Sequence, residues 1–307
     1  MAPPILRPAG NRFADWHVSR PARYSKNKMS ASHFFSRWPS VLRLFLPAMF
    51  LVGFTPDAIP APAPVPSDRG QHVFAAGEDL TYAVFYLGFQ GGTVTMHIRN
   101  GGVHDGRPVY KLVNRAQSQQ PVTAFFPVDD RIESFIDAES FVPLQLVFHK
   151  QEGKKRTDST VSFHHEEGTA TTIKDGVTDT RPIPPGTQHA FSALYYLRSL
   201  PSVTVGSEVT LNVHHEKKNY PLHAKVEGID EITGGWGTKK ALRVGVTLPY
   251  TGIWLNSGKM DIWVTNDPSH VPLKMKANMV IGSITAELID GPGITHEFDD
   301  SSARNSF

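Results

Sequence analysis

Hydrophobic and polar residues alternate with a period of two along most of the chain between residues 78 and 290. The alternation is clear at Leu80–Tyr86, Val94–Ile98 and Leu273–Met279. Because successive side chains of a strand point to opposite faces, this pattern predicts strands with one apolar face. About a dozen such runs, with turn signals roughly every 8–12 residues, predict an all-β, mainly antiparallel fold.

One segment breaks this period. Residues 188–200 are good helix formers, carry apolar residues on most sides, and stop before Pro201. A helix that is apolar on most sides is buried. The sequence therefore predicts a buried helix at about 188–200, which covers or fills a curved sheet, half-barrel or barrel. Thr187 is the expected N-cap, since its hydroxyl can accept a backbone hydrogen bond of the first turn.

Arg198 falls in the last turn of this predicted helix, where a cation suits the negative end of the helix dipole. A guanidinium on a buried helix also needs a carboxylate partner. Glu78 and Asp261 are candidates for that partner, and ligand binding by Arg198 is the alternative.

Composition divides the chain into four parts. Residues 1–56 hold eight Lys/Arg against one acid and contain an apolar run at 44–54. That run is too short to span a bilayer but suits an export signal. Residues 57–73 form a Pro-rich, extended linker. Residues 74–290 are expected to form a single β-rich domain, with a split at the helix as the weaker alternative, and residues 291–307 to form a disordered tail.

The export signal predicts a periplasmic protein that is membrane-peripheral at most. An uncleaved N-terminal anchor and a buried apolar segment of the fold are the alternatives. The cleavage site stays open, because Ala61-Pro62-Ala63 is followed by Pro64.

Charge and cysteine content exclude several functional classes. The chain has 307 residues, with 31 Lys+Arg against 29 Asp+Glu, and this near-neutral balance argues against a nucleic-acid partner. Residues 77–290 carry 21 basic and 23 acidic residues, so the positive excess belongs to the leader. The absence of cysteine excludes disulfides, a thiolate nucleophile and Cys-ligated metals.

Aromatic and methionine residues are the most suggestive feature for function. A curved sheet closed by a helix can enclose a lipid-sized pocket. The alternative is a filled core that needs the same residues. The candidate ligand contacts are Tyr82, Tyr86, Tyr195, Tyr196, Trp254, Trp263 and Met275.

Two histidine clusters, His164-His165-Glu166-Glu167 and His214-His215-Glu216, contain groups that bind divalent metals. Adjacent strand residues point to opposite faces, so each cluster offers at most two ligands to one site. Both clusters also lie at predicted hairpin turns. We therefore expect solvated turns here, and neither a metal nor another cofactor.

Catalytic signatures are scarce. The chain contains no phosphate-binding glycine motif, no nucleophile elbow and no H-E-x-x-H helix. Asp129, Asp130 and Glu133 lie at the start of a predicted strand, and paired carboxylates of this kind could act on a glycan, with an exposed turn as the alternative. Basic runs at residues 154–156 and 217–218 lie in predicted loops that could contact anionic lipid.

Three segments in order resemble domain-of-unknown-function family 3108. They are residues 77–82 followed by Gly91-Gly92, residues 191–198, and residues 262–267 with Pro272 and Gly282. The resemblance implies an exported protein of Gram-negative bacteria with a mostly β fold and no established activity, and it supplies no catalytic residues.

These observations together predict a non-enzymatic periplasmic binding module for an apolar or amphipathic, lipid-like ligand. Two alternatives stay open. One is an envelope scaffold that recognises a protein partner through its surface. The other is a glycan-acting hydrolase that uses Asp129 and Glu133.

Overall fold

The computed structural model describes residues 76–215, 217–247, 255–279, 282–292 and 294. The predicted export signal, the linker and most of the tail lie outside them. In chain order the elements are β1 (Asp79–Tyr86), β2 (Phe89–His104), β3 (Arg107–Ser118), α3 (Val122–Phe125), β4 (Asp129–Asp137), β5 (Pro143–Glu152), β6 (Lys155–His164), β7 (Thr169–Lys174), β8 (Val177–Pro182), α4 (Ala190–Arg198), β9 (Glu208–His215), β10 (Lys218–Gly234), β11 (Gly237–Thr247), β12 (Leu255–Thr265), β13 (Pro272–Met279) and β14 (Ser283–Asp290).

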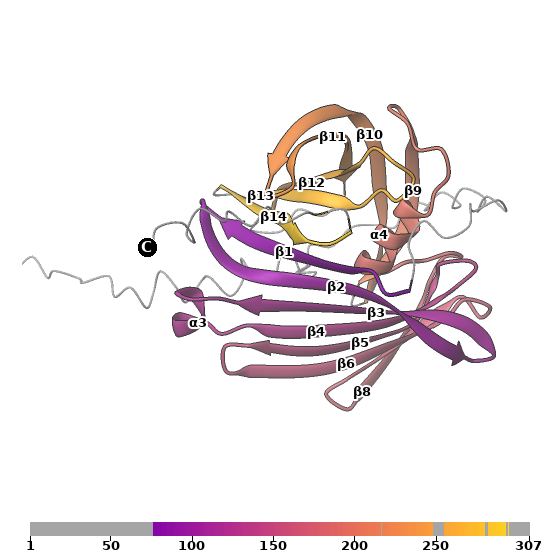
Figure 1. Ribbon diagram of the computed structural model, residues 1–307. Helices are drawn as coiled ribbons and strands as arrows, with labels where there is room; N and C mark the ends of the chain where they lie inside the picture. Colours follow the sequence, from indigo (N-terminus) through magenta and orange to yellow (C-terminus); the bar gives the residue numbers. More distant parts are fainter. Residues whose placement is uncertain (1–75, 216, 248–254, 280–281, 293, 295–307) are drawn as a thin grey trace, which may run out of the picture.

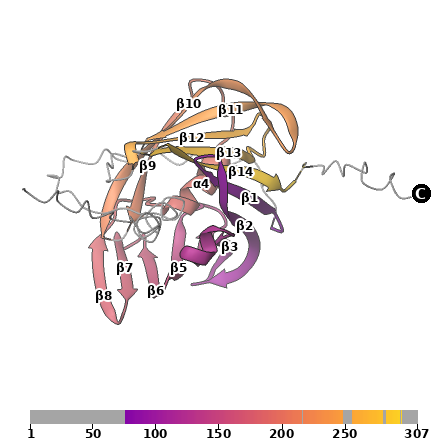
Figure 2. The same ribbon diagram turned by 90° about the vertical axis from the view of Figure 1, so that its left-hand side faces the viewer.

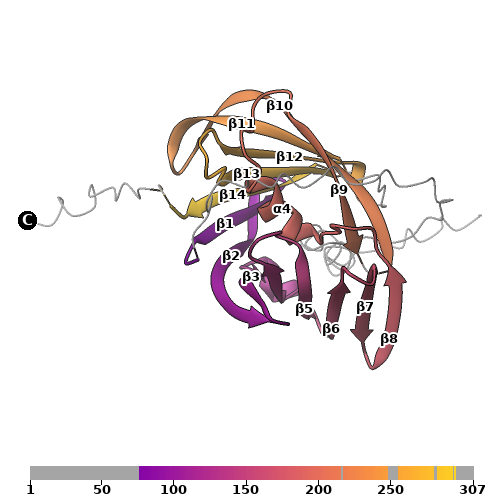
Figure 3. The ribbon, with the colours of Figure 1, turned by 90° about the vertical axis from the view of Figure 1, so that its right-hand side faces the viewer.

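All fourteen strands belong to one antiparallel sheet in the order β8-β7-β6-β5-β4-β3-β2-β1-β14-β13-β12-β11-β10-β9. The pairing of β1 with β14 joins the strands before α4 to those after it. The sheet curves around α4, with β2–β8 on one side of the helix and β10–β14 on the other (Figures 1 and 3). It does not close, and β8 and β9 are its two edges. The predicted all-β fold with one buried helix is confirmed.

Strand β8 and the short helix α3 are elements that the sequence pattern does not predict. Five of the six residues of β8 are exposed, and the sixth is half-buried. An edge strand with no buried face carries no alternation of apolar and polar residues, so its sequence, Val177–Pro182, resembles a loop.

The glycine pair that follows β1 allows two strands to approach closely. Gly91 forms a bulge, because Val84 pairs with Gly92 while Phe85 pairs with Gln90. A Cβ on Gly92 would overlap the carbonyl oxygen of Gln117 on β3. Glycine at residue 92 is therefore required by packing between β2 and β3.

Helix α4 begins later than predicted, and its N-cap is His189. The imidazole Nδ1 accepts the Ser192 backbone N–H at 3.3 Å, and Ser192 Oγ accepts the His189 N–H at 2.9 Å. The prediction of Thr187 as N-cap is wrong, since its hydroxyl donates to the Pro184 carbonyl instead. Gln188 cannot join the helix because it forms a parallel bridge with Val213 of β9.

A buried ion pair holds the C-terminal end of α4. The Arg198 guanidinium donates to both carboxylate oxygens of Glu78, at 2.7 and 2.8 Å, and both side chains are less than a tenth exposed. It also donates to the Ser269 carbonyl. Of the two predicted partners, Glu78 is therefore the one that the structure confirms. The pair joins the helix to the start of β1.

Replacing Arg198 by Met should destabilise the protein strongly, because the carboxylate of Glu78 is left buried without its partner. We expect a loss of about 3–5 kcal/mol in the free energy of unfolding, measured by urea denaturation. Combining Arg198→Met with Glu78→Gln should cost less than the sum of the two single changes, since no charge is then left unpaired.

The exposed pair between Arg115 and Asp129, with nitrogen–oxygen distances of 2.7 and 2.6 Å, provides a control of the same chemistry. Solvent screens this pair, so Arg115→Met should cost about 1 kcal/mol or less. If Arg115→Met and Arg198→Met lowered the free energy of unfolding equally, the buried pair would contribute no more to stability than the exposed one.

Candidate functional site

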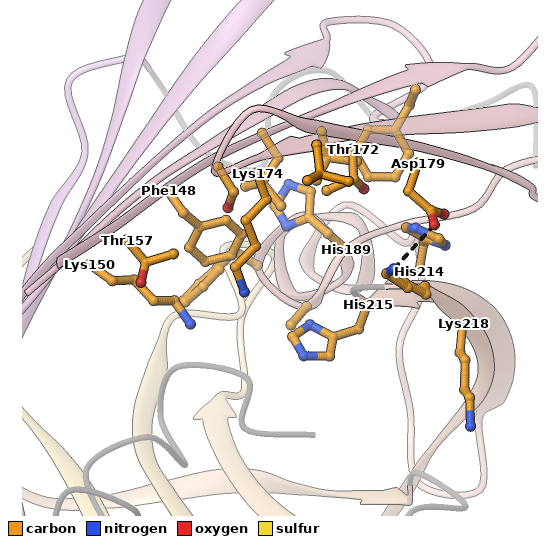
Figure 4. A pocket seen from close by; sticks show the side chains of 18 of the residues that line it. Phe148, Lys150, Thr157, Thr172, Lys174, Asp179, His189, His214, His215 and Lys218 are labelled. Carbon is orange, nitrogen blue, oxygen red and sulfur yellow. Dashed lines mark ion pairs between the residues drawn. The ribbon is translucent and has the colours of Figure 1, made fainter. Parts of the chain in front are cut away.

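A cavity of about 440 Å³ lies between the two edges of the sheet. Its lining comes from β5–β8 on one side, from β9 and β10 on the other, and from the N-terminal end of α4 (Figure 4). This volume falls within the range of roughly 300–1,000 Å³ that is usual for small-molecule sites.

The floor of the cavity is apolar. Leu146 and Phe148 of β5, with Val161 and Phe163 of β6, all belong to a second hydrophobic cluster beside the main core. In each strand the two residues are two positions apart and share one face. Phe191 of α4 packs against both clusters, so the helix covers the inner end of this floor.

Three histidine rings pack against the Phe163 ring, and two of them, His189 and His214, line the cavity. The His189 and His214 rings each lie 6.2 Å from the Phe163 ring, centroid to centroid. Because His189 Nδ1 accepts a backbone N–H, its proton is on Nε2, which donates to Ser134 Oγ at 2.7 Å. Burial lowers the pKa of His189 to about 3. This neutral imidazole is therefore a fixed structural link between α4 and β4.

Side chains join the two edges of the sheet at one end of the cavity. His214 Nδ1 donates to Asn219 Oδ1, and Asn219 Nδ2 donates to the Pro182 carbonyl at the end of β8, both at 2.8 Å. Lys217 adds an ion pair with Asp179 of β8 at 3.2 Å. Figure 2 shows β8 and β9 ending on the same side of the molecule.

Histidine 215 of β9 lines the cavity opposite Lys150 and Lys174. Its Nε2 atom is buried and has no hydrogen-bond partner within the described part of the chain. Burial, together with the nearby Lys150 and Lys174, lowers the pKa of His215 to about 3. Lys150 extends over the Phe148 ring, with its Nζ 5.1 Å from the ring centroid.

The prediction of a solvated turn is wrong for His214, which is only 3% exposed. Strand β9 continues through His215, so His214 faces inward and does not reach the turn. In the other cluster, Glu166 pairs with Arg107, and His165 lies 2.8 Å from the Pro143 carbonyl. The described residues contain no group of three or more His, Cys, Asp or Glu placed to hold a metal ion.

The six described residues among the predicted ligand contacts lie in or against the main core and do not line the cavity. Tyr82 is fully buried and donates to the Pro272 carbonyl at 2.9 Å, and Trp263 donates to Asp230 at 2.8 Å. Trp254 lies outside the described residues. A ligand-binding role stays a prediction for the whole set: Tyr82, Tyr86, Tyr195, Tyr196, Trp254, Trp263 and Met275.

The cavity residues that the sequence analysis missed include Phe148, Phe163 and Phe191. All three carry the ordinary signal of buried positions. Nothing in that signal distinguishes a side chain that faces another side chain from one that faces a cavity.

A second apolar cavity, of about 90 Å³, lies at the other end of α4 beside Leu194 and Leu197 and is too small for a lipid-like ligand.

The carboxylates considered for glycan hydrolysis do not line the cavity. Hydrogen bonds from Arg115 hold the pKa of Asp129 below its usual value. Burial would raise the pKa of Glu133, but hydrogen bonds from Lys111 and Arg131 outweigh burial and lower it. Neither of these two carboxyls therefore has the raised pKa of a general acid, and Asp130, whose pKa burial raises to about 6, is fully buried and does not line the cavity.

The family model described as "Protein of unknown function (DUF3108)" matches residues 81–289, which is nearly the whole sheet. The chain belongs to this family. The family resemblance predicted from three short segments is thus confirmed, and the match includes α4 and every lining residue of the cavity.

Two solved structures are similar to this member of the DUF3108 family. One is a β-barrel-like protein of domain of unknown function DUF1849 from Brucella abortus, with 12% identity and a TM-score of 0.48, covering 70% of this chain and 96% of that one. The other is a protein with a YmcC-like fold from Bacteroides fragilis, with 11% identity and a TM-score of 0.28, covering 70% and 94%. Comparison with curated proteins gives no match.

Asp130 should make the stability of the protein depend on pH. Its side chain is fully buried, and burial raises its pKa to about 6 from 3.8. Because the folded state holds this proton more tightly, stability is lost as the pH rises from about 4 to about 6. Asp130→Asn should remove that loss. The difference in the free energy of unfolding between this variant and the wild type should therefore shift in favour of the variant by about 2–3 kcal/mol as the pH rises over this interval.

The adjacent Asp129 provides a control with the opposite sign. Its pKa is lowered, so its contribution to stability is present above pH 4 and is lost on acidification. Asp129→Asn should therefore lose stability relative to the wild type as the pH rises. Parallel pH profiles for Asp130→Asn and the wild type, measured by chemical denaturation, would contradict the assignment.

Proposed function

We propose that this protein is a non-enzymatic binding protein of the cell envelope that holds an apolar or amphipathic, lipid-like ligand. The observation that carries the proposal is the cavity of about 440 Å³ between the sheet edges, with its floor of Leu146, Phe148, Val161 and Phe163. The basic leader with its short apolar run supports export to the envelope.

Burial of an acyl chain on this floor would contribute favourably to the free energy of binding. Each methylene group transferred from water to an apolar site contributes about 0.8 kcal/mol. A chain of about ten methylenes on the four floor residues contributes about 8 kcal/mol, which is comparable with the roughly 4–15 kcal/mol lost in translational and rotational freedom on association. The cavity is already formed between strands of one sheet, so binding needs no rearrangement of the fold.

The titratable groups of the lining favour binding over acid–base chemistry. His189 and His215 are both neutral, with pKa values near 3, which is too low for a general base at neutral pH. Asp179 is ion-paired with Arg181 and Lys217, and these partners keep its pKa below the usual value.

Thr172→Trp should block the ligand site. Thr172 lies on β7 between Val161 and Asp179, lines the cavity, and is half-buried. An indole there fills space that the ligand needs. We expect the affinity for the neutral fluorescent probe N-phenylnaphthylamine, measured by titration, to fall about tenfold or more.

Thr171→Trp is the matched control. Thr171 precedes Thr172 on the same strand, but its side chain points to the opposite face, where its hydroxyl lies 3.0 Å from that of Thr180. This variant should bind the probe as the wild type does. Native mass spectrometry of the protein purified from a periplasmic extract should show lipid bound to the wild type and to Thr171→Trp only.

Saturable binding to the wild type that Thr172→Trp leaves unchanged would contradict the assignment of the site. No binding of probe or lipid to the wild type would contradict the proposed function. The envelope scaffold with a protein partner would then be the remaining interpretation.

A further inference from the structure

The rim of the cavity is rich in lysine although the rest of the domain is not basic. Residues 77–290 carry 21 basic and 23 acidic residues, so a positive excess at the cavity is local. The charged lining residues are Lys150, Lys174, Asp175, Asp179, Lys217 and Lys218.

Two of these lysines, Lys150 and Lys174, line the cavity from β5 and β7. Lys217 is paired with Asp179, and Lys218 extends away from the site (Figure 4). Within the part of the chain that the structure describes, no carboxylate lies within ion-pair distance of Lys150 or Lys174. Lys150 is two positions after Phe148 of the floor and shares its strand face, and Lys174 is two positions after Thr172, which lines the cavity beside Val161.

A third polar group faces the same space from the opposite strand. The buried Nε2 of His215 has no hydrogen-bond partner among the described residues, and both Lys150 and Lys174 are near enough to act on its charge. Two ammonium groups and an imidazole thus converge at one end of the apolar floor (Figure 4). An anion placed between them would accept charge-assisted hydrogen bonds from the two ammonium groups.

We propose that the ligand is an amphiphile with an anionic headgroup, a carboxylate or a phosphate, which Lys150, Lys174 and His215 bind while its chain lies on the apolar floor. This inference rests on the proposed function and specifies its ligand class. The floor beside the lysines is what favours an amphiphile over a free anion, because a free anion would leave that floor in contact with water.

The test compares ligands that share a chain and differ in headgroup. Decanoate, decyl phosphate, decanol and inorganic phosphate compete with N-phenylnaphthylamine for the full chain in about 0.15 M salt, where the Debye length of about 8 Å screens remote charges. The proteins are the wild type, the double variant Lys150→Gln/Lys174→Gln, and Lys240→Gln as a control. Lys240 is exposed on β11 and does not line the cavity.

We expect the wild type to bind decanoate and decyl phosphate about tenfold or more tightly than decanol. The double variant should lose this preference and keep its affinity for decanol, and Lys240→Gln should retain the preference. The unchanged affinity for decanol also shows that the double variant is folded. His215→Leu should lower the affinity for the anionic ligands alone.

Two results would overturn the inference while leaving the proposed function in place: equal affinity of the wild type for decanoate and decanol, or a preference that survives in the double variant. Failure of every chain compound to displace the probe would instead contradict both proposals. Lysine-dependent binding of inorganic phosphate without binding of decanol would show a simple anion site and would also contradict both.

Discussion

The ion pair between Arg198 and Glu78 fixes the helix to the middle of the sheet, and the placement of the other elements follows from it. Glu78 directly precedes β1, which lies in the interior of the strand order, next to β14. A sheet with a long apolar concave face needs a cover, and α4 supplies one whose position is set by a bidentate contact without access to water. On one side of the β1–β14 pair, strands β2 to β8 curve around the helix. On the other side, strands β13 to β9 do the same. The edges β8 and β9 consequently face each other across the N-terminal half of the helix.

The N-terminal end of α4 is held by different contacts, and these shape the cavity. His189 joins it to Ser134 of β4. The backbone N–H of Gln188 donates to the Asn212 carbonyl of β9 at 2.7 Å, and the His214 N–H donates to the Gln188 carbonyl at 2.8 Å. The chain therefore crosses from one edge of the sheet to the other at this point and keeps β9 in place without a direct ladder between β8 and β9. The cavity lies beside this crossing of the chain. Its floor is apolar, and its rim carries the lysines.

The sequence was sufficient for the fold class because each strand with one buried face carries its own alternation. It also narrowed the partner of Arg198 to two carboxylates, one of which is correct. It failed at β8, where both faces are exposed, and at the N-cap, where a β-bridge of Gln188 competes with the first turn of the helix. For the site the failure has one physical cause. Hydrophobicity marks a position as buried, but only the spatial order of the strands decides whether Phe163 faces a cavity while Tyr82 faces the core.

The two edges of the sheet, β8 and β9, are joined by side chains and not by a main-chain ladder. Polar contacts between β8 and the β9–β10 hairpin include the hydrogen bond from the Asn219 amide to the Pro182 carbonyl and the ion pair between Lys217 and Asp179. Neutral hydrogen bonds contribute about 0.5–1.5 kcal/mol each, and exposed ion pairs about 1 kcal/mol or less. Parting this seam breaks no main-chain ladder and uncovers little of the core. The contacts across this seam and the contacts that hold the fold are thus separate sets of interactions, so substitutions that weaken the seam should leave the fold in place.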